Sequence, residues 1–299
     1  MEYSELLDMA NAKSDPAEQM QFVLAFGMSN YSSTIGRAGK PFNPLLGETY
    51  EYVSRDRQFR YIAEQVSHHP VGFFFFQVKH RISDGEEQPI SACHCESPHY
   101  IFWSDSTLET KFNGKSMSII PKGHCHVILK STGHHYSWKK VVTSVQNIIV
   151  GTLYVDHYGV MEITNHSTGH VGRLKFIQRG WRGQNACVVE GGVYANAETE
   201  EKLFTLNGKW SDTLTSKKTS ADPNADDQRL HVIWKRHDLP EHAAQNWNLT
   251  HFAISLNECS DELAKVLAPS DARFRPDQRA MEKYDGLSSL SSRKGSMRW

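Results

Sequence analysis

The chain has 299 residues, with 33 lysines and arginines against 34 aspartates and glutamates, so its net charge is −1. Hydrophobic residues make up 39% and charged residues 22%, which excludes collagen-like, coiled-coil and wholly disordered chains. The balanced charge argues against a globally basic nucleic-acid-binding protein, and no stretch approaches the roughly 20 apolar residues of a membrane span.

The first 35 or so residues are predicted to be helical. Asp15 followed by Pro16 forms a helix start, because a carboxylate can cap the first turn and proline suits its first position. Apolar residues then recur with the spacing of one buried helix face, at Met20, Val23, Leu24, Met28 and Tyr31. The segment Tyr3–Met9 resembles the last part of another helix, so we expect helices over 1–38.

Short apolar or β-branched runs alternate with turn residues over 45–257. The runs are YEYV, FRYIAEQV, HYIFW, SMSII, HCHVILK, KVVTSV, NIIVGTLYV, VMEI, RLKFI, ACVVEGGVYA, KLFTLNGKW, HVIWKR and HFAISL. Many short strands at regular spacing predict a single, mainly β domain with flanking helices, built on a large antiparallel sheet or barrel. The polar stretch 211–229 is expected to be a loop. Helix is predicted again over 260–282, starting at Ser260, and a disordered tail over 283–299.

Histidines and cysteines gather in short clusters, as in Cys93-His94-Cys95, His124-Cys125-His126 and His134-His135. A zinc site needs about four converging ligands in spaced pairs, and these clusters lack such pairs, so we interpret them as ordinary strand residues and expect no metal or other cofactor. The five cysteines form no dense disulfide framework, which indicates a reducing cytosol. The sequence contains no nucleophile elbow, P-loop or dinucleotide fingerprint, so it offers no positive sign of catalysis.

Two segments carry residue types that could bind an anion. The first, Lys40–Glu48, holds two prolines and a glycine, which indicate a rigid loop between a helix and a strand; its lysine could face an anion or simply face solvent. The second, Glu64–Pro70, ends in His68 and His69. Adjacent histidines in a strand point to opposite faces, so they converge on one phosphate only if the strand ends or bends there. The alternative is a chance pair.

KPFNPLLGETYE and EQVSHHP together resemble the lipid-binding domain of the oxysterol-binding-protein-related family. Further similarity lies in ISACHCES, FNGKSMSI, NIIVG, LNGKW, FAISLNE and DARFRPDQRAME, and it extends over about residues 2–282. The resemblance implies a large, nearly closed antiparallel β-barrel with a central apolar tunnel. It also implies non-catalytic transfer of a sterol or phospholipid, with phosphatidylinositol 4-phosphate bound by its head group at the mouth. Barrels of sufficient size can hold such ligands.

The resemblance assigns head-group binding to Lys40 and Asn43 of the first segment and to His68 and His69 of the second. These residues would supply a charge, a positioned amide and two imidazole donors around a phosphate. The partners it implies are membrane lipids, a sterol and a phosphoinositide, and no nucleic acid. We expect a monomer in the cytoplasm, peripheral to the endoplasmic reticulum or another organelle.

Three departures from the family pattern stand out. After Pro70, residues 71–88 form an insertion, and the pattern resumes at Pro89. An N-terminal lid that covers the tunnel mouth is expected to be missing, and so is the C-terminal helix whose charges complete the head-group pocket. These departures leave two rivals: a lipid sensor or interaction module without transfer activity, and a hydrolase, which the lack of a nucleophile motif disfavours.

Overall fold

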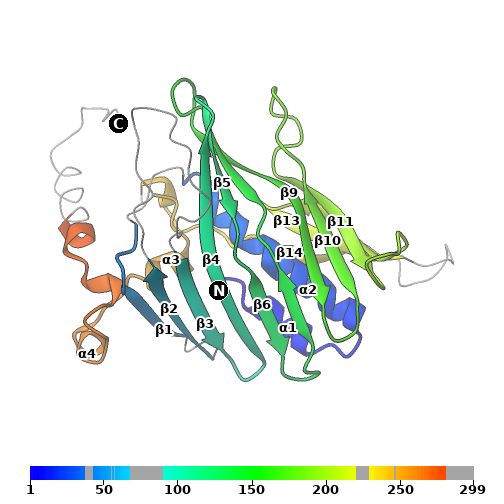
Figure 1. The fold of residues 1–299 in the computed structure, drawn as a ribbon, viewed down its shortest axis with the longest axis horizontal. Coiled ribbons are helices and arrows are strands. Elements are labelled where there is room, and N and C mark those ends of the chain that lie inside the picture. Colours follow the sequence, from blue (N-terminus) through cyan, green and yellow to red (C-terminus); the bar gives the residue numbers. More distant parts are fainter. Residues whose placement is uncertain are drawn as a thin grey trace.

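The computed structural model describes residues 1–37, 43–54, 56, 58–67, 90–219, 229–245 and 247–280. Within these ranges, 14 strands form one antiparallel sheet, shown in Figure 1. The strands are β1 (Thr49–Ser54), β2 (Phe59–Ser67), β3 (Ile90–Glu96), β4 (Tyr100–Phe112), β5 (Ser116–Pro121), β6 (Cys125–Leu129), β7 (His135–Trp138), β8 (Val142–Gln146), β9 (Tyr154–Asn165), β10 (Val171–Phe176), β11 (Val188–Tyr194), β12 (Lys202–Lys209), β13 (Thr213–Lys218) and β14 (His231–Lys235). The insertion expected over 71–88 and the tail 283–299 lie outside the described residues.

The predicted antiparallel sheet with flanking helices is confirmed. The hydrogen-bonded order runs from β1 to β5, then through β8 to β14, so β1 and β14 are the outer strands of the described sheet. Between β4 and β9 the sheet divides. One branch is β5 paired with β8, and the other is β6 paired with β7. Both branches join the same two long strands, which are therefore bridged twice.

The helices lie at the two ends of the chain. They are α1 (Glu5–Asn11), α2 (Pro16–Ser29), η1 (Asn30–Thr34), η3 (Ala243–Gln245), α3 (His251–Ser255), α4 (Asp261–Ala264) and η4 (Ala272–Phe274), and residues 276–280 are also helical. The predicted helix start is confirmed, because Asp15 Oδ1 accepts a hydrogen bond of 2.8 Å from the Ala17 amide. Ser260 caps α4 in the same way, through the Leu263 amide.

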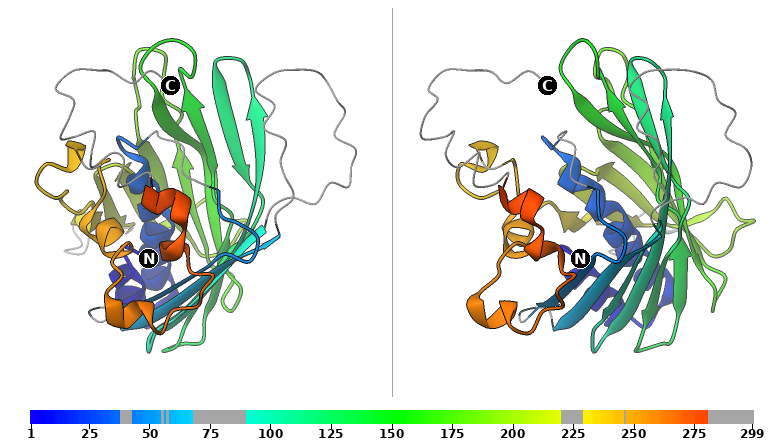
Figure 2. Two further views of the ribbon diagram at one scale, coloured as in Figure 1. Left: turned by 90° about the vertical axis from the view of Figure 1, so that its left-hand side faces the viewer. Right: turned by 60° about the vertical axis from the view of Figure 1, so that its left-hand side comes forward.

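The expectation of one buried face on α2 is wrong, because nearly the whole helix is buried. The sheet curves around α1 and α2 (Figure 2), and α2 contacts α1 as well as β9 to β12 and β14. Even Gln19 and Gln21 are buried, and the Gln19 side chain is bonded to Tyr136 and His134. The core therefore lies between these two helices and the concave face of the sheet.

Other predicted elements differ in type. HFAISL is helix α3 rather than a strand, because Thr250 caps its first turn through the Ala253 amide at 3.1 Å. The first part of NIIVGTLYV is a loop, and β9 begins only at Tyr154. The loop expected over 211–229 contains β13, whose Leu214 and Ser216 alternate into the core. The short strand β7 carries two polar residues, His135 and Ser137, and no apolar run predicted it.

The antiparallel order fixes which connections share a sheet edge. β2 ends at Ser67, β4 at Phe112, β8 at Gln146 and β10 at Phe176, all at the edge that we call the upper edge (Figure 1). Ser67 pairs with Ile90, which pairs with Thr107, so β4 extends beyond the end of β2 at this edge. No helix within the described ranges is both long and apolar enough to cross a bilayer.

Candidate functional site

Of the four residues predicted to bind a head group, the structure describes only Asn43. Lys40, His68 and His69 lie outside the described residues. The Asn43 carbonyl oxygen accepts a hydrogen bond of 2.6 Å from Nη1 of Arg275. The structure does describe residues close to these three, namely Asn43 in the first segment and Ser67 in the second. The contacts that hold these two residues are called the frame of the site.

The two segments meet through the backbone at the upper edge. The Gly47 amide donates to the Gln65 carbonyl at 2.9 Å, and the Gln65 amide donates to the Glu48 carbonyl at 3.0 Å. Gly47 has a φ of +73°, a conformation that favours glycine, so this residue makes the turn from the first segment into β1. The segment containing Asn43 and the strand leading to the histidine pair are therefore joined side by side.

The end of β2 is irregular where the sequence analysis expected a strand end or bend. The pairing of β2 with β3 shifts register between Gln65 and Ser67. The buried Gln65 side chain donates through Nε2 to the Ser67 carbonyl at 2.6 Å and accepts from the Ser91 hydroxyl. The bond from Gln65 to the Ser67 carbonyl stabilises the backbone at this bulge. A bulge changes the direction of the strand, here where the chain leaves the sheet.

A buried guanidinium holds this region together. Arg275, with a side chain only 7% exposed, donates to Glu48 Oε2 at 3.0 Å and to the carboxylate of Asp277. Glu48 in turn accepts from the Leu45 amide at 2.8 Å. The hydrogen bond from Arg275 holds the pKa of Asp277 below its ordinary value and raises that of Arg275 itself. The C-terminal segment thus anchors the described part of the Lys40 loop.

A second ion pair anchors the same segment to β1. Arg273 and Asp271 are both buried and share two hydrogen bonds of 2.8 Å. Burial alone would raise the pKa of Asp271, but the bonds from Arg273 hold it below its ordinary value. Arg273 also lies 4.7 Å from the ring centre of Tyr50 and donates to the Glu51 carbonyl. Each charge therefore has hydrogen-bonding partners, as buried ions require.

Partly exposed apolar side chains continue from the core onto the inner face of β1 to β3. Tyr52 and Tyr61 are paired across β1 and β2, and Cys93 on β3 pairs with Ala63, two residues along β2 from Tyr61. Phe252 of α3 packs edge-on to Tyr52 at 5.9 Å between ring centres, and Tyr50 bonds the Leu256 carbonyl. Because these side chains pack against the core but keep accessible surface, they form an apolar wall that a hydrophobic ligand could cover.

Of the histidine and cysteine clusters, His124 and His134 lie just before β6 and β7 rather than in a strand. Strand geometry holds, as predicted, for Cys93 and Cys95. Both point toward the core side while His94 is exposed, and burial raises the pKa of Cys95 to about 12. His126 and His135 bond each other at 3.1 Å between ring nitrogens beside the parallel ring of Trp103. Within the described ranges, no group of three or more His, Cys, Asp or Glu is arranged to hold a metal ion.

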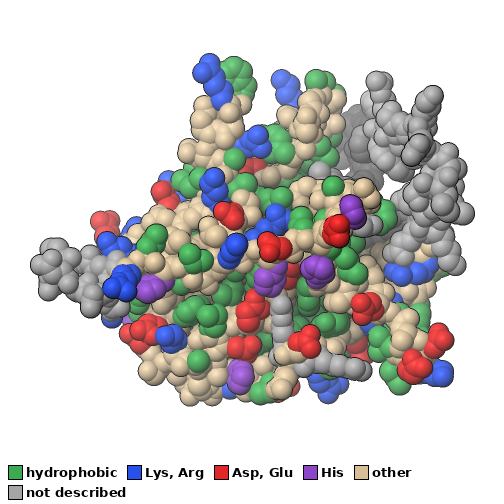
Figure 3. All heavy atoms as spheres, turned by 180° about the vertical axis from the view of Figure 1, so that it is seen from behind, with side chains coloured by type: hydrophobic (Ala, Val, Ile, Leu, Met, Phe, Trp, Pro, Cys, Tyr) green, Lys and Arg blue, Asp and Glu red, His purple; other side chains and the backbone are tan. Residues whose placement is uncertain are grey.

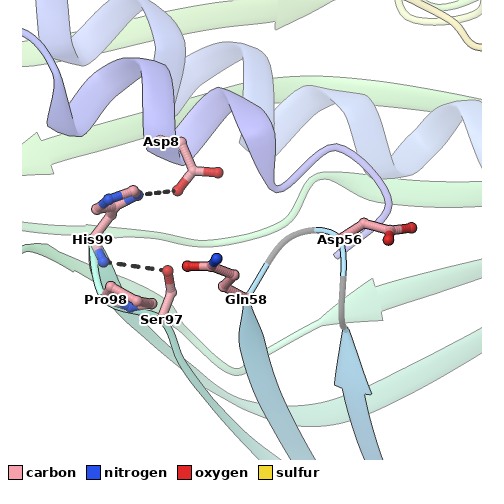
Figure 4. Close-up of a pocket in the computed structure, with 6 residues that line it drawn as sticks. All are labelled: Asp8, Asp56, Gln58, Ser97, Pro98 and His99. Carbon is pink, nitrogen blue, oxygen red and sulfur yellow. Dashed lines mark hydrogen bonds and ion pairs between the residues drawn. The ribbon is translucent and has the colours of Figure 1, made fainter.

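A pocket of about 270 Å³ lies at the opposite edge of the sheet, between the β1–β2 and β3–β4 turns and α1 (Figure 4). Its lining is polar. His99 Nδ1 lies 2.9 Å from Asp8 Oδ1, and the His99 amide donates to Ser97 Oγ at 3.2 Å. None of the predicted site residues lines it, and its polar lining does not suit an apolar ligand.

The residues that build this frame carry no anion-binding or catalytic motif that would single them out in the sequence. Arg273, Arg275, Asp271 and Glu48 lie in DARFRPDQ and LLGE, strings that contributed only to the family resemblance. The alternating Asp-x-Arg-x-Arg-x-Asp charges of 271–277 were the available signal. Arg273 and Arg275 also bond the Glu51 carbonyl and the Glu48 carboxylate, each more than two hundred residues away, and no local spacing shows that pairing.

The family model described as oxysterol-binding protein matches residues 1–88 and 77–289. Human oxysterol-binding protein-related protein 6 is 41% identical over 285 residues, which are 95% of this chain and 28% of that protein. Oxysterol-binding protein homolog 2 of Saccharomyces cerevisiae is 39% identical over 307 residues, covering 95% of this chain and 22% of the relative. The chain thus spans about a quarter of the length of these relatives.

Solved structures give the same match. The Osh1 ORD domain in complex with cholesterol has a TM-score of 0.80 at 35% identity, over 96% of this chain and 67% of that chain. The Osh3 ORD of Saccharomyces cerevisiae in complex with PI(4)P has a TM-score of 0.77 at 29% identity, over 94% and 68% respectively. The described fold is therefore that of these lipid-bound domains.

Proposed function

Since this chain belongs to the oxysterol-binding protein family, we propose that it binds and transfers a membrane lipid without catalysis. The lipid body, a sterol or a phospholipid, would cover the apolar wall of Tyr52, Tyr61, Cys93 and Phe252 and the interior beyond it. The relevant energy is the removal of apolar lipid surface from water, which requires no reacting group in the protein.

The proposed head-group site consists of Lys40, Asn43, His68 and His69, with phosphatidylinositol 4-phosphate as the ligand. The observation that carries it is the backbone pairing of Gly47 and Glu48 with Gln65, which joins the two segments at the upper edge. Arg275 supports the assignment, because its bonds to Asn43 and Glu48 fix the frame of the Lys40 loop. The bound forms of Osh1 and Osh3 support the two ligand classes.

We place this activity in the cytoplasm, at the surface of the endoplasmic reticulum or another organelle. All five cysteines are free, although the chain has enough of them for two disulfides. Free thiols suit a reducing compartment. The insertion proposed for 71–88 begins directly after the signature, so its effect on lipid exchange is best measured in the same assay.

The test is transfer between two vesicle populations, one with a labelled sterol and one with labelled phosphatidylinositol 4-phosphate. His68→Ala with His69→Ala is expected to abolish phosphoinositide transfer, because two donors to the phosphate are lost. His124→Ala with His166→Ala is the matched control, since both of these histidines are exposed and distant in sequence from the segments. Lipid binding without transfer by the unaltered chain would favour the sensor. Ester hydrolysis that the double variant loses would favour an enzyme.

A further inference from the structure

Exposed apolar side chains gather on the connections at the upper edge. Phe112 ends β4 and is 63% exposed, while Ile149 and Val150 in the β8–β9 loop are 69% and 81% exposed. Trp181 in the β10–β11 loop is 95% exposed. Side chains of this size are normally covered in a soluble protein, and a group of them at projecting tips marks an interaction surface.

These connections are ordered by hydrogen bonds and lie beside one another. The Ile148 amide donates to the Lys115 carbonyl at 3.2 Å, which links the β8–β9 loop to the β4–β5 turn. The β10–β11 loop runs back along β9, because the Arg179 amide donates to Asp156 at 2.9 Å and its guanidinium lies 4.5 Å from the ring centre of Tyr154. The tips are therefore held in place rather than left to find their own conformation.

Basic residues outnumber acidic ones in these segments and at their ends, where Glu109 and Asp156 are the carboxylates. Residues 110–119, 146–155 and 177–187 contain Lys111, Lys115, Arg179 and Arg182 but no aspartate or glutamate, although the whole chain has a net charge of −1. Lys111 is paired with Glu109 of β4, which also binds Lys122. Figure 3 shows hydrophobic and Lys or Arg side chains together at the ends of two projections.

We propose that Phe112, Ile149, Val150 and Trp181, with Lys115, Arg179 and Arg182, form a docking rim that inserts into an anionic membrane surface. Apolar tips next to cations suit the interface of a bilayer, where the side chains reach the acyl boundary and the charges meet anionic head groups. A protein partner would be expected to bind a contiguous apolar surface. Separate loop tips instead fit a lipid bilayer, because lipids can rearrange around each inserted side chain.

The rim lies at the edge where the predicted head-group segments leave the sheet. Ser67, Ile90 and Thr107 are in register across β2 to β4, and β4 then continues five residues to Phe112. Docking through the rim would therefore turn this edge toward the membrane. The inference rests on the proposed function for its purpose, but its evidence is independent of Lys40, His68 and His69.

The experiment is flotation of the full chain with vesicles of phosphatidylcholine, with and without phosphatidylserine. Val150→Ser and Trp181→Ser are each expected to weaken binding to the anionic vesicles about tenfold. Each variant removes most of an apolar side chain that the membrane would bury. Val266→Ser is the matched control, since Val266 is 79% exposed but follows α4, far from the rim in Figure 1. The Lys115→Gln and Arg182→Gln pair should weaken binding and its salt dependence, whereas Lys265→Gln should not.

Two further measurements keep this proposal distinct from lipid transfer. Binding of a fluorescent sterol delivered from cyclodextrin needs no vesicle, so the rim variants should bind it as the unaltered chain does. If the unaltered chain binds neither the sterol nor labelled phosphatidylinositol 4-phosphate but the rim variants still lose flotation, the proposed function fails and the rim stands. Unchanged flotation of the Val150→Ser, Trp181→Ser double variant would overturn the rim. A dimer that the same variant dissociates would also overturn it, by assigning the surface to a second copy.

Discussion

His157 shows how a single buried side chain sets a pH limit. The Thr34 hydroxyl donates to the Tyr31 carbonyl at 2.8 Å, so its oxygen is left to accept from Nε2 of His157, and Thr143 donates to Nδ1, each at 3.0 Å. This arrangement satisfies both ring nitrogens of a neutral imidazole without a carboxylate partner. Burial lowers the pKa of His157 from 6.5 to about 4.

The sign of the pH effect follows from where protons bind. Between pH 6.5 and about 4 the unfolded chain protonates His157 and the folded chain does not, so the free energy of unfolding falls as pH falls. The loss should reach about 3 kcal/mol for this group. His157→Gln should flatten this part of the profile in urea unfolding, and exposed His124→Gln should leave it unchanged. Equal slopes for His157→Gln and the unaltered chain would refute the assignment.

Arg275 tests the frame of the candidate site. Arg275→Met leaves Glu48, whose side chain is only 10% exposed, without this cation, so unfolding should require about 3 kcal/mol less. Lys130→Met breaks the more exposed pair with Glu96, at 34% and 59% exposure, and should change stability by less than about 1 kcal/mol. Equilibrium denaturation with an unchanged m-value measures both. Equal losses in the two variants would mean that the buried pair does not stabilise the frame.

Helix α2 packs directly on β10 because Gly172 has no side chain. A Cβ there would lie 2.7 Å from Leu24 Cδ1 and 2.9 Å from Met20 Sδ. Gly172→Ala should therefore destabilise the protein by about 1 to 3 kcal/mol through overpacking. Leu24→Ala removes the obstructing side chain. The double variant should therefore lose less free energy of unfolding than the two single variants lose in total. Additive losses, measured by thermal or urea unfolding, would exclude this contact as the cause.

The elements that the sequence predicted well are those with a local signal. Asp15 and Pro16 mark the start of α2, and short apolar or β-branched runs between turn residues mark strands such as β2 and β10. The failures come from local patterns that tertiary context overrides. The apolar Ile148–Val150 run suggests a strand, yet these residues form a loop at the upper edge. The frame around Asn43 could not be predicted in the same way, because Arg275 is 232 residues away in the chain.

At the scale of the whole molecule, the near-zero net charge conceals an uneven distribution. The three segments at the upper edge hold four cations and no carboxylate, so the rest of the chain carries the compensating negative charge. A protein of this kind has little long-range attraction to anionic surfaces but a strong local one. The segments of the proposed head-group site and the exposed apolar tips share that edge, so both proposals assign the membrane to the same side of the curved sheet.

The divided sheet between β4 and β9 also has a consequence for the order of folding. The pairs are nested, because Ile128 pairs with His135 inside the loop that Ile119 and Thr143 close. Forming the β6–β7 hairpin first shortens the chain that β5 and β8 must close, and so lowers the entropic barrier to the outer pair. We expect Val127→Ala in β6 to slow folding and Ile119→Ala in β5 to speed unfolding, which stopped-flow chevron analysis would measure. The inner hairpin would then act as the template on which the two long strands are brought together.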